Sequence, residues 1–584
     1  MVRLRGGRKT GGNMREGGKF GKNGLNGSED SLGGNSGGNI EAYKNGTDEC
    51  GITNENGTKD KVMNLFRIYG ESMSAEMEAD RRIEEIIRQF FKQPYVNSGT
   101  DLKSLTSNFE DFKIPVYPSD VSSYMDFFSE KVAANSTRTS SPRFIGHMTS
   151  ALPYFMRPLS KLLTAMNQNL VKVETSKALS PLERQSLAML HRLIYKFPDE
   201  FYSTNAQNSK STLGIVTSGG TTANITALWC ARNSRLGRTD GFAGVEAEGM
   251  DAALRYYGYD GAAIIGSAAM HYSFDKAADL LGIGARNLIK VPVDRFNRID
   301  TDALRREIDA CRRSGKCLIA VIGIAGSTDC GSVDPIKEMA EIAREAGTHF
   351  HVDAAWGGPL LFSEKHRNKL EGLDRADSVT IDGHKQLYLP IGIGMVFMKD
   401  PHLASVIEKK AQYIIREGSV DLGKRSLEGS RPGVSVYLHA SLNIIGEKGF
   451  GFLVDEGVRK AGYMAALICS RQEFELLAEP ETNLVVYRYV PGKFREKAEA
   501  GILTESENRI INSINERLQK EQRRKGNSFV SRTTLNSTRY GINTPVAALR
   551  AVIANPLTSE KDIEAVLDEQ ARIGAGLEQT PEYF

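Results

Sequence analysis

Several side chains suited to covalent chemistry follow apolar runs in the middle of the sequence. Lys385 follows SVTIDGH, Asp353 follows FHV, and His271 comes shortly after AAIIG. A desolvated lysine keeps its amine available for a Schiff base, and a carboxylate can pair with a protonated ring nitrogen. An imidazole can stack on a flat ring, for which Ala355 leaves room. Taken singly, Asp353 could instead cap a turn and His271 could be a structural residue.

A glycine-rich segment adds a candidate anion site. IVTSGGTTAN, residues 215–224, leaves an apolar strand through Ser218, Gly219 and Gly220, and a helix is expected from Thr221. Glycine permits close backbone approach, and the free N–H groups and dipole at a helix start attract a phosphate. A tight turn without a ligand uses the same residue types. Together with the lysine, carboxylate and imidazole, however, the segment completes the set of groups that pyridoxal phosphate requires.

The pattern around these motifs predicts the framework that positions them. Between about Leu213 and Met398, helical patterns such as 221–235 and 334–347 alternate with the apolar runs LGIVT, AAIIG, LIKVPV, LIAVIGIAG, FHVDAAW, SVTID and GMVFM. This alternation is typical of a mostly parallel sheet covered on both faces. Ligands bind such sheets at the carboxyl ends of the strands, which is where the motifs lie.

Helical patterns precede this region. They begin near Lys61 and recur over 121–134. Ser180, Pro181 and Glu183 form the pattern of a capping box, which opens a helix that runs to about residue 197.

A different pattern follows the sheet region. A long helix is expected from Tyr437 to Ser470, then a strand over 483–489, a polar helix around 510–519, and a further strand and helix. This order predicts a smaller α+β domain. We therefore expect a tail over 1–60, a helical segment over 61–179, a large domain over 180–436 and a small domain over 437–584.

The composition is that of a globular protein. The chain has 584 residues, of which 40% are hydrophobic and 25% charged, enough for two or three domains. No apolar run approaches the ~18 residues of a membrane-spanning helix. The six cysteines have no CxxC spacing, so neither a disulfide scaffold nor a metal site is expected, and the cytoplasm is the predicted location.

The first 60 residues differ from the rest. They hold 16 of the 57 glycines, and the first 22 residues carry seven Lys or Arg against one acid. A segment with so little apolar pattern is predicted to be disordered and dispensable. A nucleic-acid-contacting arm and a transit peptide are the alternatives, but the latter would need an apolar face. Because the tail carries the excess charge, the body is not predicted to bind nucleic acid.

The order of the motifs resembles one enzyme family. TSGG, HYS, HVDAAWGG and DGHK occur in the same order in the group II pyridoxal-phosphate-dependent amino-acid decarboxylases. The resemblance runs from about Ser141 into the C-terminal domain. It implies an α/β fold of the aspartate-aminotransferase type, called fold type I, with a mostly parallel seven-stranded sheet and a smaller C-terminal α+β domain. It also implies pyridoxal 5'-phosphate as the cofactor.

The resemblance assigns roles to single residues. Lys385 would bind the cofactor as a Schiff base, Asp353 would contact the pyridine nitrogen, and His271 would lie on the ring face. These three are the implied catalytic residues. The implied cofactor-binding residues are Ser218, Gly219, Gly220, Thr221, His271, Thr328, Asp353, Ala355, His384 and Lys385.

Two further segments concern the substrate. GHKQLYLP and SLEGSRPG look most like those of the bacterial pyridoxal-dependent aspartate 1-decarboxylases. This implies decarboxylation of L-aspartate to β-alanine, a precursor of pantothenate and coenzyme A. A glutamate decarboxylase, an aminotransferase or lyase on the same fold, and a non-catalytic relative are the alternatives.

An acidic substrate needs a cation for its second carboxylate, and an arginine can bind that group bidentately. Arg143 in SPRF is the first candidate and Arg431 the second, although either could pair with a structural acid. Arg431 also lies in a segment that resembles one reaching into a partner's site, so a homodimer with shared active sites is implied.

The sequence departs from the family at one catalytic position. In the animal glutamate decarboxylases a mobile loop presents a tyrosine, linked to reprotonation of the substrate carbon, where this chain has Val420. Tyr413 or His271 could supply the proton instead. Ser141 stands where the family commonly has a histidine.

Overall fold

The computed structural model describes residues 55–67, 70–410 and 418–579. The chain divides into two compact units, Met1–Arg67 and Ile68–Phe584. In the first unit, helix α1 (Glu55–Asn64) begins ahead of the expected onset of order at Lys61. Most of the predicted tail lies outside the described residues. In the part of the chain that is described, no helix is both long enough and apolar enough to cross a membrane.

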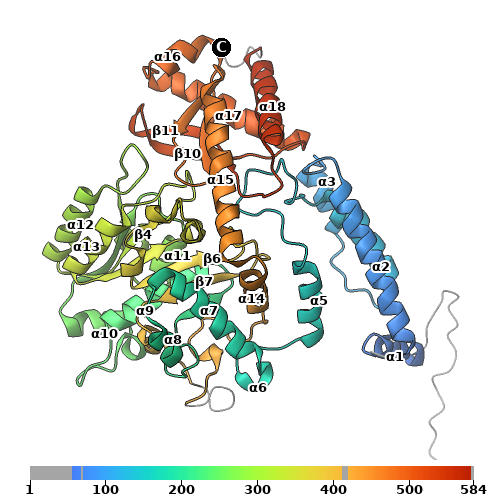
Figure 1. The fold of residues 1–584 in the computed structure, drawn as a ribbon, viewed down its shortest axis with the longest axis horizontal. Helices are drawn as coiled ribbons and strands as arrows, with labels where there is room; N and C mark the ends of the chain where they lie inside the picture. The colour runs from blue at the N-terminus through green and yellow to red at the C-terminus, as the bar shows by residue number, and fades with distance from the viewer. Residues whose placement is uncertain (1–54, 68–69, 411–417, 580–584) are drawn as a thin grey trace, which may run out of the picture. The chain divides into compact units, whose positions relative to one another are not determined.

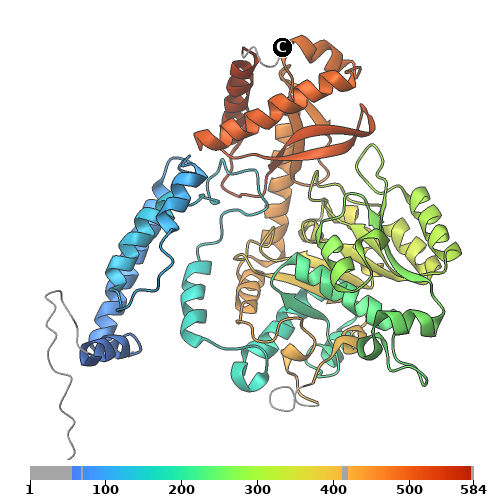
Figure 2. The same cartoon turned by 180° about the vertical axis from the view of Figure 1, so that it is seen from behind.

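A seven-stranded sheet forms the centre of the large domain (Figures 1 and 2). Its strand order is β1-β7-β6-β5-β4-β2-β3. Neighbours from β6 to β3 pair in parallel, and β7 is antiparallel to both β1 and β6. The mostly parallel sheet predicted from the seven apolar runs is therefore confirmed. The strands are β1 (Gly214–Thr217), β2 (Gly261–Ser267), β3 (Leu288–Val291), β4 (Lys316–Ile324), β5 (His349–Asp353), β6 (Ser378–Asp382) and β7 (Gly394–Met398).

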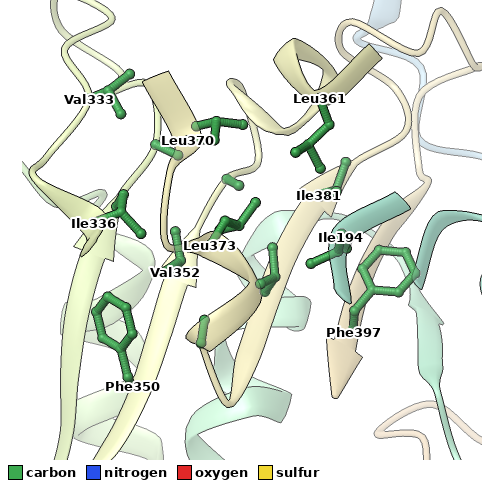
Figure 3. Packing of buried hydrophobic residues seen from close by; sticks show 14 of the residues in the cluster. Ile194, Val333, Ile336, Phe350, Val352, Leu361, Leu370, Leu373, Ile381 and Phe397 are labelled. Atoms are coloured by element: carbon green, nitrogen blue, oxygen red, sulfur yellow. The ribbon is translucent and has the colours of Figure 1, made fainter. Parts of the chain in front are cut away.

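Helices cover both faces of this sheet because side chains alternate along each buried strand. Ala262 and Ile264 of β2 pack with α9 (Gly220–Arg235), α10 (Val245–Tyr257) and α11 (Ser273–Leu280). Ala263 and Ile265 belong to the opposite layer, with α7 (Leu179–Tyr195), α12 (Thr301–Arg313) and α13 (Ile336–Ala346). Figure 3 shows part of this second layer.

A four-stranded antiparallel sheet forms the core of the C-terminal region. Its order is β10-β11-β9-β8, from β8 (Phe474–Ala478), β9 (Leu484–Tyr489), β10 (Ser531–Thr538) and β11 (Gly541–Val552). The helices α17 (Glu505–Lys525) and α18 (Glu560–Glu578) each begin with a capping box, at Thr504 and Ser559. The predicted smaller α+β domain is confirmed.

The single long helix expected after Tyr437 is in fact two. They are α14 (Ser435–Ile444) and α15 (Gly446–Cys469). Gly446 has a φ of +71°, in the left-handed region that glycine adopts without steric cost, so the chain changes direction there. α15 then contacts both the turn over 358–362 and the strands β8 and β9, which links the two sheets (Figure 1).

The remaining α-helices are short, except for the one that opens the second unit. They are α2 (Glu71–Lys92), α3 (Leu102–Thr106), α4 (Val121–Phe127), α5 (Met156–Met166), α6 (Val173–Ser176), α8 (Asp199–Asn205) and α16 (Arg495–Glu499).

The capping box expected at Ser180 is wrong. α7 already begins at Leu179, and the Ser180 hydroxyl lies inside the helix, 2.6 Å from the hydroxyl of Ser176. The carboxylate of Glu183 forms a bidentate ion pair with Arg431, and the two side chains are 0% and 9% exposed. The buried guanidinium of Arg431 needs this counter-charge, so the Glu183 carboxylate is not available to cap the helix.

Glu183→Gln should therefore destabilise the fold. It would leave the buried guanidinium of Arg431 without a counter-charge, a change that commonly costs about 3–5 kcal/mol. Thermal unfolding should give a clearly lower Tm. Asp251→Asn is the control, because it removes an exposed pair with Arg255 that is worth at most about 1 kcal/mol. Equal Tm values for the two variants would contradict this account.

Candidate active site

A cavity of about 400 Å³ lies at the carboxyl ends of the strands of the large sheet. Apart from His147, the residues that line it come from the segments at the ends of β1, β2, β4, β5 and β6 and from the start of α9. All of the predicted cofactor-binding residues are among them: Ser218, Gly219, Gly220, Thr221, His271, Thr328, Asp353, Ala355, His384 and Lys385. The structure thus brings the separate motifs together at one site.

The start of α9 provides an anion cradle. No side chain caps this helix, and its first residues, Gly220 and Thr221, line the cavity, so its first N–H groups are available to an anion there. A Cβ on Gly220 would lie 2.8 Å from Oδ2 of Asp382, so a larger residue there would force the loop or that carboxylate to move. Among the described residues, Glu428 reaches this loop and accepts a hydrogen bond from the Ser218 N–H at 3.2 Å. In the segment SLEGSRPG it is therefore Glu428, and not Arg431, that contacts the loop.

Lys385 follows β6 and carries a counter-charge beside it. Its Nζ lies 3.0 Å from Oδ2 of Asp382, and Nε2 of His384 lies 3.7 Å from the same oxygen. The Lys385 side chain is 20% exposed, so its amine is accessible from the cavity. The other oxygen of Asp382, Oδ1, is buried without a hydrogen-bond partner among the described residues. This arrangement keeps the amine in place while the cavity is free to accept a ligand.

Asp353, the last residue of β5, is held by two hydrogen bonds. Its Oδ2 accepts from Nδ2 of Asn224 at 2.9 Å, and its Oδ1 accepts from the N–H of Ala355 at 3.1 Å. Asp353 is only 8% exposed. A carboxylate supported in this way can serve as the partner of a cationic group in the cavity. The small side chain of Ala355 lines the cavity beside it.

His271 lies in the turn between β2 and α11. Its Nδ1 accepts a hydrogen bond from the N–H of Ser273 at 3.2 Å, so the neutral ring carries its proton on Nε2. Burial lowers the pKa of His271, against the opposing effect of the Asp353 charge. The imidazole is therefore held neutral and in one tautomer.

The two arginines expected to bind substrate do not line this cavity. Arg143 is half exposed and pairs with Asp562 at 3.4 Å, and Arg431 is committed to Glu183. Tyr413, one of the two proposed proton donors, lies outside the described residues.

Sequence reasoning missed several residues at this site. His147, Asn224, Tyr272, Trp356 and Asp382 also line the cavity. His147 belongs to SPRFIGHMTS, a segment that the sequence did single out. Burial lowers its pKa, and the positive charges of Arg550 and Lys385 lower it further.

Arg550 comes from β11 in the small domain and gave no signal in the sequence. Its Nη1 donates to the carbonyl oxygen of Thr328 at 2.6 Å, and its Nε donates to Oγ of Ser531 at 3.0 Å. The small domain therefore places a guanidinium next to two residues of the cavity wall, Thr328 and His147.

This combination fits a flat, phosphate-bearing aldehyde. The uncapped helix start suits the phosphate, the Asp353 carboxylate suits a ring nitrogen, and Lys385 suits the aldehyde. No group of three or more His, Cys, Asp or Glu side chains suited to a metal ion occurs within the described ranges.

Comparisons with known proteins agree with this geometry. The pyridoxal-dependent decarboxylase conserved domain matches residues 108–490. Aspartate 1-decarboxylase of Aliivibrio fischeri is 45% identical over 503 residues, which cover 85% of this chain and 91% of that protein. Acidic amino acid decarboxylase GADL1 of Mus musculus is 28% identical over 446 residues, 75% of this chain and 74% of that protein.

The crystal structure of mouse CSAD superposes with a TM-score of 0.75 at 23% identity, covering 86% of this chain and 99% of that one. The fold is therefore fold type I, as the resemblance implied. With the domain match and the 45% identity, these findings show that the chain belongs to the pyridoxal-dependent decarboxylases, carboxy-lyases that use pyridoxal 5'-phosphate.

Proposed function

We propose that this decarboxylase acts on an acidic L-amino acid, L-aspartate, and releases its α-carboxylate as carbon dioxide to give β-alanine. The observation that carries the proposal is the 45% identity to a protein named aspartate 1-decarboxylase. A relative named for acidic amino acids supports the same substrate class. The β-alanine formed would supply pantothenate and coenzyme A. L-glutamate is the alternative substrate, and the cytoplasmic location stays a prediction from cysteine usage.

In the proposed site, Lys385 would hold the aldehyde of the cofactor, and Gly220 and Thr221 would hold its phosphate at the start of α9. When bound, pyridoxal phosphate supplies a sink for the electron pair left as carbon dioxide departs. The Asp353 carboxylate would keep the ring nitrogen protonated, because a nearby negative charge favours the charged form. Asp382 provides the counter-charge, 3.0 Å away, for the free Lys385 amine.

A proton must then reach the α-carbon. His271 is the candidate among the described residues, because its neutral ring carries a proton on Nε2. Tyr413 remains the other candidate from the sequence.

Arg550 is the proposed cation for a substrate carboxylate. In the described part of the chain, Lys385 is the only lysine or arginine that lines the cavity, but Arg550 donates to the carbonyl oxygen of Thr328, which does line it. Arg143 and Arg431 are each paired with a carboxylate, whereas the hydrogen bonds of Arg550 go to neutral oxygens. Burial lowers the pKa of Arg550, against the opposing effect of Asp329. A bound carboxylate would offset the desolvation of this charge.

We also propose a homodimer. Large apolar side chains in the segment 109–128 are exposed in the single chain, with Phe112 at 89%, Ile114 at 91% and Val116 at 86%. Clustered exposure of this kind marks an interaction surface, and a second copy is the partner that the family resemblance implies. Arg431 gives no support to a shared site, because it pairs within its own chain. A sedimentation experiment on the full chain should give a molecular mass twice that of one chain.

The substrate proposal predicts the order of kcat/KM values. The kcat/KM for L-aspartate should exceed that for L-glutamate by about 10- to 200-fold, since one methylene in a pocket is worth ~1–3 kcal/mol. Both values should exceed the kcat/KM for L-tyrosine. Release of carbon dioxide and of the amine is measured, with Lys385→Ala as the inactive control. Preference for glutamate would make the enzyme a glutamate decarboxylase, and preference for tyrosine would remove the acidic class.

Gly220→Ala should weaken cofactor binding. Its Cβ would lie 2.8 Å from Oδ2 of Asp382, so the loop or the carboxylate must move. Titration of the apoprotein, followed by cofactor absorbance, should show an apparent Kd raised about 10-fold or more, equivalent to ~1.4 kcal/mol. Gly462→Ala is the matched control, because its Cβ would meet no atom within 4 Å. The same Kd in both variants would refute the cradle.

Arg550→Gln should lower kcat/KM for aspartate by roughly 30-fold or more, since removal of a buried charge partner costs ~2 kcal/mol or more. The loss should appear mainly in KM and should be smaller for an uncharged amino acid. Arg143→Gln, measured in parallel, decides between the two arginines. A loss confined to the Arg143 variant would transfer the role to Arg143.

A further inference from the structure

A buried chain of hydrogen bonds leads from Asp353 toward the start of β5. Nδ2 of Asn224 donates to Oδ2 of Asp353 at 2.9 Å, and Oδ1 of Asn224 lies 3.0 Å from Nε2 of His351. Nδ1 of His351 lies 2.8 Å from Oγ of Ser378, and the same Oγ lies 2.7 Å from Nε2 of His349. Asn224, His351 and Ser378 are at most 1% exposed.

The direction of every hydrogen bond in this series follows from the Asp353 carboxylate. Because a carboxylate only accepts, Asn224 must turn its Nδ2 toward Asp353 and its Oδ1 toward His351. His351 must then donate from Nε2, which leaves Nδ1 to accept the hydroxyl proton of Ser378. The oxygen of Ser378 in turn accepts from Nε2–H of His349. All donors therefore point toward Asp353.

The protonation of His351 agrees with this direction. Burial is the main cause that lowers the pKa of His351, to about 3, and the neighbouring His349 lowers it further. The ring is therefore neutral at pH 7 and has one N–H to place. That N–H could be donated to Ser378 or to Asn224. Because the Asp353 carboxylate fixes the orientation of the Asn224 amide, the N–H is on Nε2 and donates to Asn224.

Asn224 also connects the two groups that face the cofactor ring. Its Nδ2 lies 3.0 Å from Oγ of Ser273, and the N–H of Ser273 donates to Nδ1 of His271 at 3.2 Å. The orientation of the Asn224 amide therefore affects the positions of both Asp353 and His271.

We propose that His351 is a positioning residue for Asp353, acting through Asn224 by the hydrogen bond from its Nε2–H. This inference rests on the proposed role of Asp353 at the pyridine nitrogen. Without that N–H, Oδ1 of Asn224 would be buried without a donor, which is costly enough to make the amide move. Asp353 would then lose one of its two hydrogen bonds and its fixed position.

Neutron diffraction of the deuterated, unsubstituted holoenzyme tests the directions of these hydrogen bonds. The expected result is a deuteron on Nε2 of His351, none on its Nδ1, and the Ser378 deuteron directed at that Nδ1. A deuteron on Nδ1, or on both ring nitrogens at pH 7, would overturn the proposal without bearing on whether the enzyme binds its cofactor.

Variants test the consequence. His351→Leu should lower kcat by roughly 10- to 100-fold, as losses of supporting hydrogen bonds around metal-site ligands commonly do, and should raise the Kd for pyridoxal phosphate, with KM little changed. His351→Gln, whose amide N–H can replace the Nε2–H, should restore most of the kcat and most of the affinity for pyridoxal phosphate. His191→Leu is the control, because His191 is equally buried but is bonded to Tyr202 and to the carbonyl of Met398. It should lower Tm without changing kcat or Kd.

A double-mutant cycle separates positioning from a general structural effect. If His351 acts through Asn224, the combination of His351→Leu with Asn224→Ala should be no worse than Asn224→Ala alone. Additive losses in kcat, or a His351→Gln variant as impaired as His351→Leu, would overturn the inference. Failure of the unsubstituted protein to bind pyridoxal phosphate would instead count against the cofactor site itself.

Discussion

The active site depends on keeping a carboxylate buried at the end of a central strand. Burial of Asp353 carries a desolvation cost, which the hydrogen bonds from Asn224 and Ala355 offset. Asn224 lies four residues after Gly220 on α9, so about 6 Å of rigid helix separates the anion cradle from the amide that supports Asp353. One helix therefore sets the spacing between the proposed phosphate site and the carboxylate proposed to contact the ring nitrogen.

The small domain is part of the site because a closed triangle of hydrogen bonds ties it to the sheet loops. Gln386 donates to the carbonyl of Trp356 at 2.8 Å, Nε1 of Trp356 donates to Oδ1 of Asn483 at 3.1 Å, and Nδ2 of Asn483 donates to Oε1 of Gln386 at 2.9 Å. Trp356 follows Asp353, and Gln386 follows Lys385. The loops that follow β5 and β6 are thereby fixed to the domain that carries Arg550 on β11.

Ion pairing distinguishes the three arginines considered for substrate binding. Arg431 and Glu183 neutralise each other in a buried pair, and Arg143 meets Asp562 at the surface. Arg550 instead bonds neutral oxygens beside the cavity. The sequence motifs SPRF and SLEGSRPG pointed to Arg143 and Arg431, whereas no motif pointed to Arg550. Only the positions of their acidic neighbours separate a structural arginine from one that can bind a ligand.

The sequence by itself determined the large sheet and the groups at its edge. Strand periodicity is a local property, and parallel strands bring their carboxyl ends to one edge, so Lys385, Asp353 and the glycine loop had to converge. Only the tertiary structure decided which partner each polar group takes. Glu183 is spaced as a helix cap but bonds Arg431, which is 248 residues away. Asn224 and His351 are 127 residues apart and resemble ordinary core residues until the fold joins them behind Asp353. Hydrogen bonds and ion pairs depend on distance in space, which local patterns do not encode.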